Sequence, residues 1–372
     1  MPSPTSQRLF VLSPCGTSLL TNAAAAEQRT LVSRYANEPA VAAIPASDRP
    51  VLEGLICQVR DTLLAEGTDL AMATKMSAEI NGIVKLYGGQ FHPKRGDCHY
   101  LLSTDTWLGQ QTAELIADWL KKQGCPETYV YRQTDLQTRD MQAFQSALSD
   151  LIEWCETTVD GYRQQGFRVI FNLTGGFKSV QGFLQTLAFF YADETVYVFE
   201  TSDLIRIPRL PVRLVAAETV RENLVTFRQL RLGLPAPHLD HIPETLLLQV
   251  DDQVALSPWG ELVWQRTKKA LYAEALHPAP SDQIIFSDRF QRSVAELAPD
   301  RLVQVNERID QLARYLRDGY NPRSLDFKAL KGNPCPPSTH EMDAWADQDA
   351  KRILGHFEGN CFVLDALDRG LH

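Results

Sequence analysis

The sequence predicts an α/β domain with a parallel sheet, then a small connector, then a separate α+β domain. Over the first 200 residues, short apolar segments alternate with amphipathic helical patterns, which is typical of a parallel sheet with helical crossovers. From residue 284 the order changes to one strand, two helices and three strands in succession, which is typical of an α+β fold. With 372 residues the chain is long enough to bury more than one core.

Five apolar segments are the candidate strands of the first domain: RLFVLSP (8–14), HYLLST (99–104), TYVYR (128–132), RVIFNLT (168–174) and VYVFE (196–200). One helix face between the second and third segments is marked by Leu108, Leu115, Ile116, Trp119 and Leu120. Another, after the fourth, is marked by Val180, Phe183, Leu184, Leu187 and Tyr191. The fifth segment continues through ETVYVFETSDLIRIPRLPVRL as a hairpin, so we expect the domain to end near residue 215.

Residues 216–283 are predicted to be a connector of helices and a hairpin. A helix is expected over residues 214–232, followed by the linker PAPHLDHIP. An apolar hairpin with its turn at Asp251 and Asp252 comes next. A helix then begins with Ser257 as its cap and Pro258 at its first position. Residues 284–372 form the last domain, with strand candidates around IIFS, HEMDAW, AKRILGHF and NCFVLDAL.

The composition is that of a soluble globular protein, with 44% hydrophobic and 22% charged residues. A net charge of −9 argues against general wrapping of nucleic acid. Seven cysteines without a CxxC pair do not suggest a disulfide framework or a zinc site. The stretch from Arg8 to the alanines at 23–26 mimics a secretion signal, but Ser13, Pro14 and Gly16 interrupt it. No run reaches the roughly 18 apolar residues of a membrane span, so we expect a cytoplasmic protein without a membrane partner.

Small polar residues follow the predicted strands at the edge where the carboxyl ends of those strands meet. Ligands of open parallel sheets bind at this edge. The first strand is followed by CGTSLL, the second by STDTWLGQQ and the fourth by NLTGGFKSV, and the segment TKMSAEINGI begins a further helix. The candidate ligand-binding residues are Ser13, Thr17, Ser18, Lys75, Ser77, Asn81, Ser103, Asp105, Thr106, Asn172, Thr174, Gly175, Gly176, Lys178 and Ser179.

The segment NLTGGFKSV carries the strongest of these signals. Gly175 and Gly176 let the backbone approach a ligand closely, and amides at a helix N-terminus suit phosphate or ribose oxygens. Lys178 adds a positive charge. The alternative is that the two glycines only make a tight turn. Neither GxxxxGK[ST] nor GxGxxG is present, yet four convergent polar loops favour a nucleotide-like ligand.

Residues 7–215 resemble the CARF domain of ancillary proteins of type III CRISPR systems. The resemblance rests on NLTGGFKSV, SAEIN, STDTWLGQ and the hairpin VYVFETSDLIRIPRLPV. It implies a Rossmann-like domain over residues 1–215 that works as a homodimer and binds cyclic oligoadenylate, more often the tetra-adenylate ring than the hexa-adenylate ring. It places Thr174, Gly175, Gly176, Lys178 and Ser179 on the phosphates of the ring. A two-fold symmetric ring also asks for a two-fold symmetric pocket, which favours a homodimer on physical grounds.

Residues 284–372 resemble the RelE family of toxin ribonucleases, on the order of their elements and on LKG and AKRILGHF. The resemblance implies cleavage of ribosome-bound mRNA without metal or cofactor, with the RNA 2′-hydroxyl as the nucleophile. Such chemistry needs a base, cations for the phosphorane charge, and an acid. Arg352 matches the arginine that stabilises the phosphate, and Glu341 or His340 the base. Further cations or donors are Lys331, Lys351, His356, Arg369 and His372.

This segment also departs from the RelE pattern. It carries 12 lysines and arginines against 14 aspartates and glutamates, a net charge of −2, whereas most RelE-like toxins are basic. Charge alone would then give poor affinity for ribosomal RNA. The acidic run HEMDAWADQ stands where some relatives carry lysines, so the base stays open. Arg352 could instead pair with Asp347 or Asp349, and His356 could be structural.

The sequence therefore predicts a ribonuclease of type III CRISPR antiviral defence that cyclic oligoadenylate activates and that cuts mRNA on the ribosome. Two alternatives stay open. The last domain could be a catalytically inactive module that only docks on a partner once the messenger is sensed. The CARF site could itself cleave the ring and so end the signal.

Overall fold

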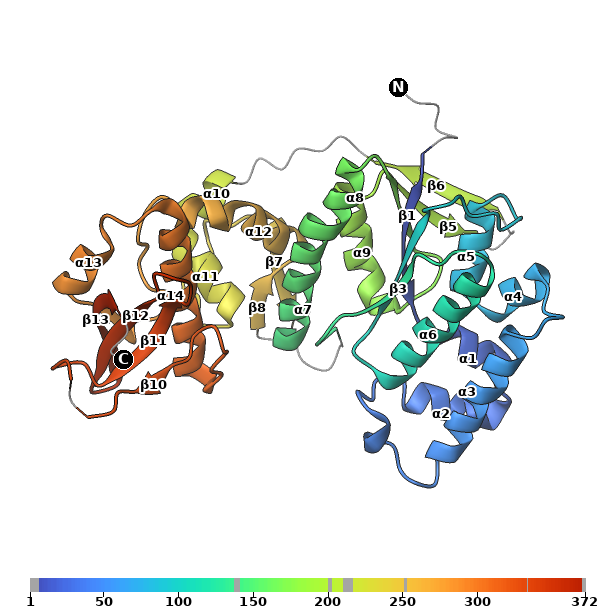
Figure 1. Ribbon diagram of the computed structural model, residues 1–372, viewed down its shortest axis with the longest axis horizontal. Coiled ribbons are helices and arrows are strands. Elements are labelled where there is room, and N and C mark those ends of the chain that lie inside the picture. The colour runs from blue at the N-terminus through green and yellow to red at the C-terminus, as the bar shows by residue number, and fades with distance from the viewer. Residues whose placement is uncertain are drawn as a thin grey trace. The chain divides into compact units, whose positions relative to one another are not determined.

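The computed structural model describes residues 7–136, 141–199, 203–209, 217–250, 253–332 and 334–369, without the side chains of residues 141–146, 178, 179 and 250. The chain forms two compact units, Met1–Arg213 and Leu214–His372 (Figure 1). None of the helices in these described ranges has the length and apolar character that a bilayer span requires.

The first unit is built on a six-stranded, largely parallel sheet (Figure 1). Its strands are β1 (Leu9–Cys15), β2 (Cys98–Ser103), β3 (Thr128–Arg132), β4 (Arg168–Asn172), β5 (Glu194–Val198) and β6 (Leu204–Pro208). Their order is β3-β2-β1-β4-β5-β6, with β6 antiparallel to β5 and all other pairs parallel. The predicted α/β class and its five strands are confirmed. The turn of the predicted hairpin, residues 200–202, lies outside the described residues.

Helices cover both faces of this sheet. One face carries α1 (Ser18–Ala23), α2 (Ala26–Arg34), α3 (Arg49–Leu63), α4 (Leu70–Met76), α5 (Ala78–Leu86) and α6 (Trp107–Lys122), and a 3-10 turn at Val41–Ala43. The other carries α7 (Met141–Trp154), a π-helical turn (Cys155–Val159), α8 (Asp160–Gln164) and α9 (Lys178–Tyr191). Alternation along β1 sends Val11 toward α5 and Phe10 toward Trp154 and Tyr162, because successive strand residues face opposite ways.

The order of the strands reverses between β1 and β4. From β1 the chain crosses to β2 and then β3 on one side, whereas β4 and β5 lie on the other side. In open α/β sheets this reversal leaves a crevice outside the carboxyl ends of the two central strands, and ligands bind there. The turns after β1 and β4 therefore form the part of the first unit where a ligand site is expected.

The second unit contains a five-stranded sheet of order β10-β11-β12-β13-β9. Its elements are β9 (Ile284–Phe286), α13 (Asp288–Val294), α14 (Pro299–Asp318), β10 (Lys328–Ala329), β11 (His340–Trp345), β12 (Lys351–Glu358) and β13 (Cys361–Arg369). Only β9 and β13 pair in parallel within the described sheet. The sheet face that carries Ile353, Phe362 and Leu364 shares one core with Phe290 of α13 and Ile309 of α14. The predicted strand, two helices and three consecutive strands are all present.

The segment predicted as a connector folds as part of this second unit. It contains α10 (Ala217–Glu222), α11 (Leu224–Leu232), a 3-10 turn (Glu244–Leu246), β7 (Leu247–Val250), β8 (Gln253–Leu256) and α12 (Pro258–Tyr272). The prediction of one helix over 214–232 is wrong, because Asn223 leaves helical geometry and its side-chain amide donates to the Thr219 carbonyl at 3.0 Å. The Ser257 cap is confirmed by its hydrogen bond from the Gly260 amide at 3.1 Å. The turn expected at Asp251 and Asp252 lies outside the described residues.

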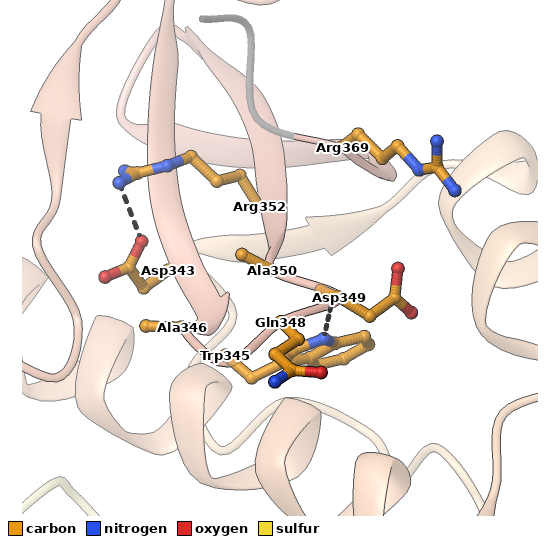
Figure 2. Close-up of a pocket in the computed structure, with 8 residues that line it drawn as sticks. All are labelled: Asp343, Trp345, Ala346, Gln348, Asp349, Ala350, Arg352 and Arg369. Atoms are coloured by element: carbon orange, nitrogen blue, oxygen red, sulfur yellow. Dashed lines mark hydrogen bonds and ion pairs between the residues drawn. The ribbon is translucent and has the colours of Figure 1, made fainter.

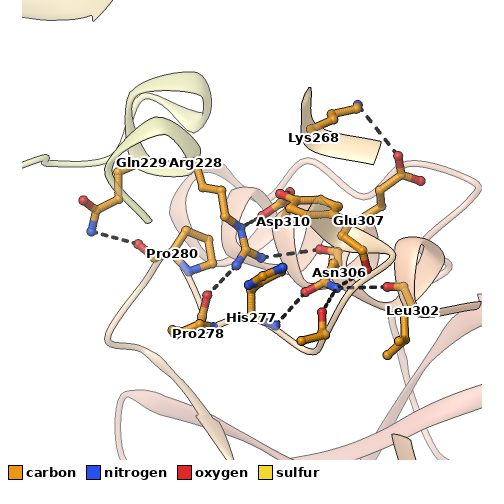
Figure 3. A network of polar contacts seen from close by, with 12 residues as sticks. Arg228, Gln229, Lys268, His277, Pro278, Pro280, Leu302, Asn306, Glu307 and Asp310 are labelled. Atoms are coloured by element: carbon orange, nitrogen blue, oxygen red, sulfur yellow. Dashed lines mark hydrogen bonds and ion pairs between the residues drawn. The ribbon is translucent and has the colours of Figure 1, made fainter. Parts of the chain in front are cut away.

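A buried polar network ties the connector to α14 (Figure 3). The side chain of Arg228 on α11 is fully buried, and its Nε donates to Asp310 of α14 at 2.7 Å. The Tyr272 hydroxyl donates to the other oxygen of Asp310. Asn306 donates to the carbonyl oxygens of Tyr272 and Ala275 at 3.1 and 2.9 Å. A buried cation without its carboxylate is very unfavourable, so this network holds α11, α12 and α14 together.

Candidate functional site

The turn between β4 and α9 packs directly against the turn between β1 and α1. Gly176 has φ +104°, which side-chain-bearing residues rarely adopt, and a Cβ there would lie 2.9 Å from Cβ of Pro14. A Cβ on Gly16 would lie 3.2 Å from the carbonyl carbon of Gly176. The backbones of the two turns are therefore in contact, and glycine is required for that contact whether or not a ligand is bound.

A carboxylate from α5 fills the space between these two turns. The Glu79 side chain is fully buried. Its Oε1 accepts hydrogen bonds from the Gly16 amide at 3.0 Å and the Gly176 amide at 3.2 Å. Its Oε2 accepts from the Ser18 and Ser77 hydroxyls, both at 2.6 Å. Two amides and two hydroxyls thus hold an anion at the crevice, and in this structure the anion is the protein's own carboxylate.

Other polar residues of the NLTGGFKSV segment hold α5 in place. The Asn172 Nδ2 donates to the Ser13 hydroxyl at 3.2 Å and to the Glu79 carbonyl at 3.3 Å. The Thr174 hydroxyl donates to Asn172 at 2.7 Å and accepts from the Val198 amide at 3.2 Å. A Cβ on Gly82 of α5 would lie 2.2 Å from Asn172 Oδ1. These contacts use most of the hydrogen-bonding capacity of Asn172 and Thr174 inside the protein.

The remaining ligand candidates of the first unit differ in exposure. Those that are buried are Ser13, Ser77, Ser103 and Thr106. Those that are half-buried are Thr17, Ser18, Asn81 and Asp105, and Lys75 is exposed in the last turn of α4. Asp105 accepts from Arg132 Nε at 2.8 Å and from the Asp135 amide at 3.1 Å. Thr17, Asn81 and Lys75 are therefore the candidates best placed to meet a ligand without breaking an existing contact.

Two candidates of the first unit, Lys178 and Ser179, remain predictions. The side chains of Lys178 and Ser179 lie outside the described residues, although α9 begins at Lys178. Burial, and secondarily the Glu79 carboxylate, raises the pKa of the Cys15 thiol well above its usual value, which disfavours the reactive thiolate.

In the second unit, three carboxylates surround the predicted phosphate-binding arginine. Arg352 Nη2 lies 2.9 Å from Asp343, and Arg352 Nη1 lies 3.2 Å from Asp326 and 3.4 Å from Glu341. Lys328 lies 2.6 Å from Asp326, and this hydrogen bond, followed by that from Arg352, lowers the pKa of the Asp326 carboxyl. The alternative that Arg352 forms ion pairs is therefore observed, but with other carboxylates than Asp347 or Asp349, and Asp347 pairs with Arg301 at 2.6 Å.

Arg352 and Arg369 line one open pocket of about 500 Å³ at the end of the sheet (Figure 2). The other residues that line it are Asp343, Trp345, Ala346, Gln348, Asp349 and Ala350. The guanidinium groups of the two arginines point away from each other, with that of Arg352 toward Asp343 (Figure 2). Two of the predicted cations thus line the same pocket, but their guanidinium groups do not converge on one position in it.

The sheet separates the two candidates for the catalytic base. Asp343 is paired with Arg352 and Glu341 with Leu354 across β11 and β12, so Glu341 and Arg352 share a face. His340 points to the opposite face, where its ring stacks on Phe327 at 5.2 Å and meets Phe357 edge-on. Burial in this aromatic cluster lowers the pKa of His340. Glu341 therefore lies with Arg352, and His340 does not.

The last candidates are dispersed. Lys351 lies next to Arg352 along the strand and so on the opposite face, with its Nζ 6.0 Å from the Trp345 ring centroid. Lys331 is exposed in the turn after β10, and His372 lies outside the described residues.

Residues 74–210 match a family described as CRISPR-associated protein (Cas_APE2256). The matched segment is less than half of the chain, and it contains α5, the β4–α9 turn and β5. Both Glu79 and the two glycines of NLTGGFKSV therefore lie inside it. The match supports a role in CRISPR defence. A search of curated proteins finds no match to the chain.

The candidates predicted from the sequence omit three residues that define these sites, although Glu79 lies with Ser77 in the segment predicted to begin a helix. Glu79 stands two residues after Ser77 in the first turn of α5, where an acidic side chain is ordinarily an exposed complement to the helix dipole. Asp326 and Lys328 lie beside Arg352, in the segment before β11. The signal for Asp326 is weak, because its φ of +46° is a conformation that Asp tolerates in many turns.

Proposed function

We propose that this chain is an endoribonuclease of CRISPR antiviral defence that cyclic oligoadenylate activates and that cuts mRNA on the ribosome. In this proposal the first unit binds the messenger as a homodimer, with tetra-adenylate as the favoured ring. The second unit is a RelE-like nuclease that needs no metal. Binding in one unit changes the activity of the other, which is a coupling free energy between two sites.

The observation that carries the messenger-binding half is the position of the TGG turn within the fold. The turn lies at the point where the strand order reverses, and it falls within the segment that a CRISPR-associated family matches. Its Gly176 amide, together with the Gly16 amide of the facing turn, already binds a carboxylate. The phosphates of the ring are anions that accept hydrogen bonds from backbone amides, as the Glu79 carboxylate does. A phosphate that takes the Gly176 amide displaces Glu79, and one that leaves Glu79 in place binds further out, near Thr17, Asn81 and Lys75.

The nuclease half is supported by Arg352 and its surroundings. A guanidinium on the middle strand of an antiparallel sheet, with a carboxylate on the same face, supplies two of the groups that transesterification by a 2′-hydroxyl requires. The test is to mix the purified chain with translating ribosomes, with and without cyclic tetra-adenylate, and to map mRNA ends by primer extension. Cleavage that depends on the messenger is expected. Absence of cleavage with every ring size refutes the nuclease.

A second candidate function is a messenger sensor whose second unit docks on a partner without catalysis. Three carboxylates occupy the donors of Arg352, and residues 284–372 carry a net charge of −2, both of which oppose the approach of RNA. Arg352→Ala separates the two candidates in cells that make the messenger. The nuclease predicts loss of toxicity with the fold intact, whereas the sensor predicts toxicity unchanged.

A further inference from the structure

A histidine, an aspartate and a serine form a buried cluster on β12, β13 and the turn before β11. Asp365 Oδ2 lies 2.9 Å from His356 Nδ1 and accepts the Ser338 hydroxyl at 2.8 Å. Asp365 and Ser338 are only 6% and 3% exposed, while the His356 side chain is 21% exposed. The cluster does not contain Arg352.

An irregularity in the sheet creates this cluster. Leu354 pairs with Ala366, but the next residue, Gly355, pairs with Leu364, so Asp365 is an extra residue in β13. Such a bulge turns a side chain out of the regular alternation, and bulges occur often beside active sites. Gly355 is required here, because a Cβ would lie 2.5 Å from the Val363 carbonyl oxygen. Asp365 lies on the same face as Val363, which pairs with His356, and its carboxylate contacts the imidazole beside the bulge.

The carboxylate fixes the tautomer and orientation of the ring. An acceptor at Nδ1 places a proton on that nitrogen, which leaves Nε2 for a partner outside the cluster. Nε2 has no hydrogen-bond partner in the described part of the chain. Among the described residues, the ionisable groups nearest the ring are Asp365 on β13, Glu358 on the same face of β12, and Glu341, which lies diagonally across on β11. An imidazole held by a buried carboxylate with one free nitrogen is the arrangement of a proton donor or acceptor.

His356 lies on the same face as Arg352 and Glu341. Phe357, the next residue, points into the opposite aromatic cluster of Phe327 and Phe362. Because Glu341 pairs with Leu354, it is a diagonal neighbour of both Arg352 and His356. Residues in diagonal positions on adjacent strands are about 7–8 Å apart. A cation, a carboxylate and an imidazole thus lie along one sheet face within reach of a single RNA linkage.

We propose that His356 is the general acid of the second unit and that Asp365 is its positioning residue. This inference rests on the proposed nuclease function. The base takes the proton of the 2′-hydroxyl, the 2′-oxygen forms a bond to phosphorus, and the bond from phosphorus to the 5′-oxygen breaks. The protonated imidazole gives its Nε2 proton to the departing 5′-oxygen. The products are a 2′,3′-cyclic phosphate and a 5′-hydroxyl, and His356 is left neutral.

The test uses the full chain with cyclic tetra-adenylate and ribosomes stalled on a defined mRNA. One mRNA carries the natural linkage at the cleavage position, and a second carries sulfur in place of the 5′-bridging oxygen. A thiolate leaves without a proton, so a general acid is not needed for the sulfur substrate. We expect His356→Ala to slow cleavage of the natural linkage about 10²- to 10⁴-fold and to cleave the sulfur linkage at nearly the wild-type rate.

The sulfur substrate also serves as the folding control, since a misfolded variant is slow on both substrates. Asp365→Asn is expected to show a smaller loss that sulfur also relieves. Ser338→Ala, which removes the other donor to the same Asp365 oxygen, should show a loss no larger than that of Asp365→Asn, and sulfur should relieve it as well. An equal loss on oxygen and sulfur in a variant whose circular dichroism spectrum and urea midpoint match those of the wild type, or no loss at all, overturns the role of His356 while the nuclease stands. If the wild type itself does not cut the natural linkage, the nuclease and this inference both fail.

Discussion

Replacing Glu79 is the sharpest perturbation that the first unit offers. Glu79→Ala leaves the buried Gly16 amide and the half-buried Gly176 amide without an acceptor, and each orphaned donor costs up to about 1–3 kcal/mol. We expect a loss of about 2–6 kcal/mol in the free energy of unfolding. Glu79→Gln keeps an acceptor for both amides but loses the charge. Because charge-assisted hydrogen bonds are roughly twice as strong as neutral ones, we expect a loss of about 1–2 kcal/mol.

Equilibrium urea unfolding of the full chain measures both values, and hydrogen exchange of peptides that cover Gly16 and Gly176 shows whether the change is local. The matched control is Glu114→Ala, which removes a half-buried carboxylate bonded only to the side chains of Gln110 and Gln111. It should cost less than about 1 kcal/mol. Acetate should raise the urea midpoint of Glu79→Ala relative to chloride at equal ionic strength, because a small carboxylate can refill the site. If Glu79→Ala lowers the free energy of unfolding no more than the control does, and acetate has no effect, then the two amides do not form an anion site.

Three further predictions concern other residues. Gly82→Ala should destabilise the chain by about 1–3 kcal/mol in urea unfolding, since its Cβ meets Asn172. Gly54→Ala, at an exposed position of helix α3 where a Cβ meets nothing, should stabilise it by about 0.5–1 kcal/mol. Burial lowers the pKa of His99 to about 3, so the folded chain binds fewer protons than the unfolded chain as pH falls below 6.5. Between pH 7 and pH 5 the free energy of unfolding should therefore fall by about 2 kcal/mol more in the wild type than in His99→Gln. Arg352→Ala should lower messenger-dependent mRNA cleavage about 10²- to 10³-fold, and Arg352→Lys should recover only part of it, because a lysine cannot bond a phosphate in a bidentate way.

The strands of the first unit were predictable because their signal is local. RVIFN and TYVYR are short runs of β-branched and aromatic residues with polar ends, and their parallel pairing follows from the helical patterns between them. The site edge was predictable for the same reason, since small polar residues gather only after the strands. Asn223 shows the limit of periodicity. An apolar helical pattern continued across it, while its own side chain competed for the backbone.

The sequence did not predict which acceptor the backbone amides of the site bind. Glu79 lies 63 residues from Gly16 and 97 from Gly176, and no short motif relates residues at such separations. The same limit applies to Asp365. Alternation along NCFVLDAL places Asp365 on the same face as Val363, but it gives no sign of the bulge or of the pairing of Val363 with His356. In both cases the chemistry depends on tertiary packing that buries a carboxylate against partners from other segments.

Isothermal titration calorimetry of the wild-type chain with cyclic tetra-adenylate measures whether the first unit binds the messenger. We expect heat of binding with a stoichiometry of one ring for two chains. We also expect weaker binding by Gly176→Ala, because an alanine at φ +104° distorts the turn that carries the amide. No heat with any cyclic adenylate, or binding by Gly176→Ala equal to that of the wild type, would contradict the proposed messenger site.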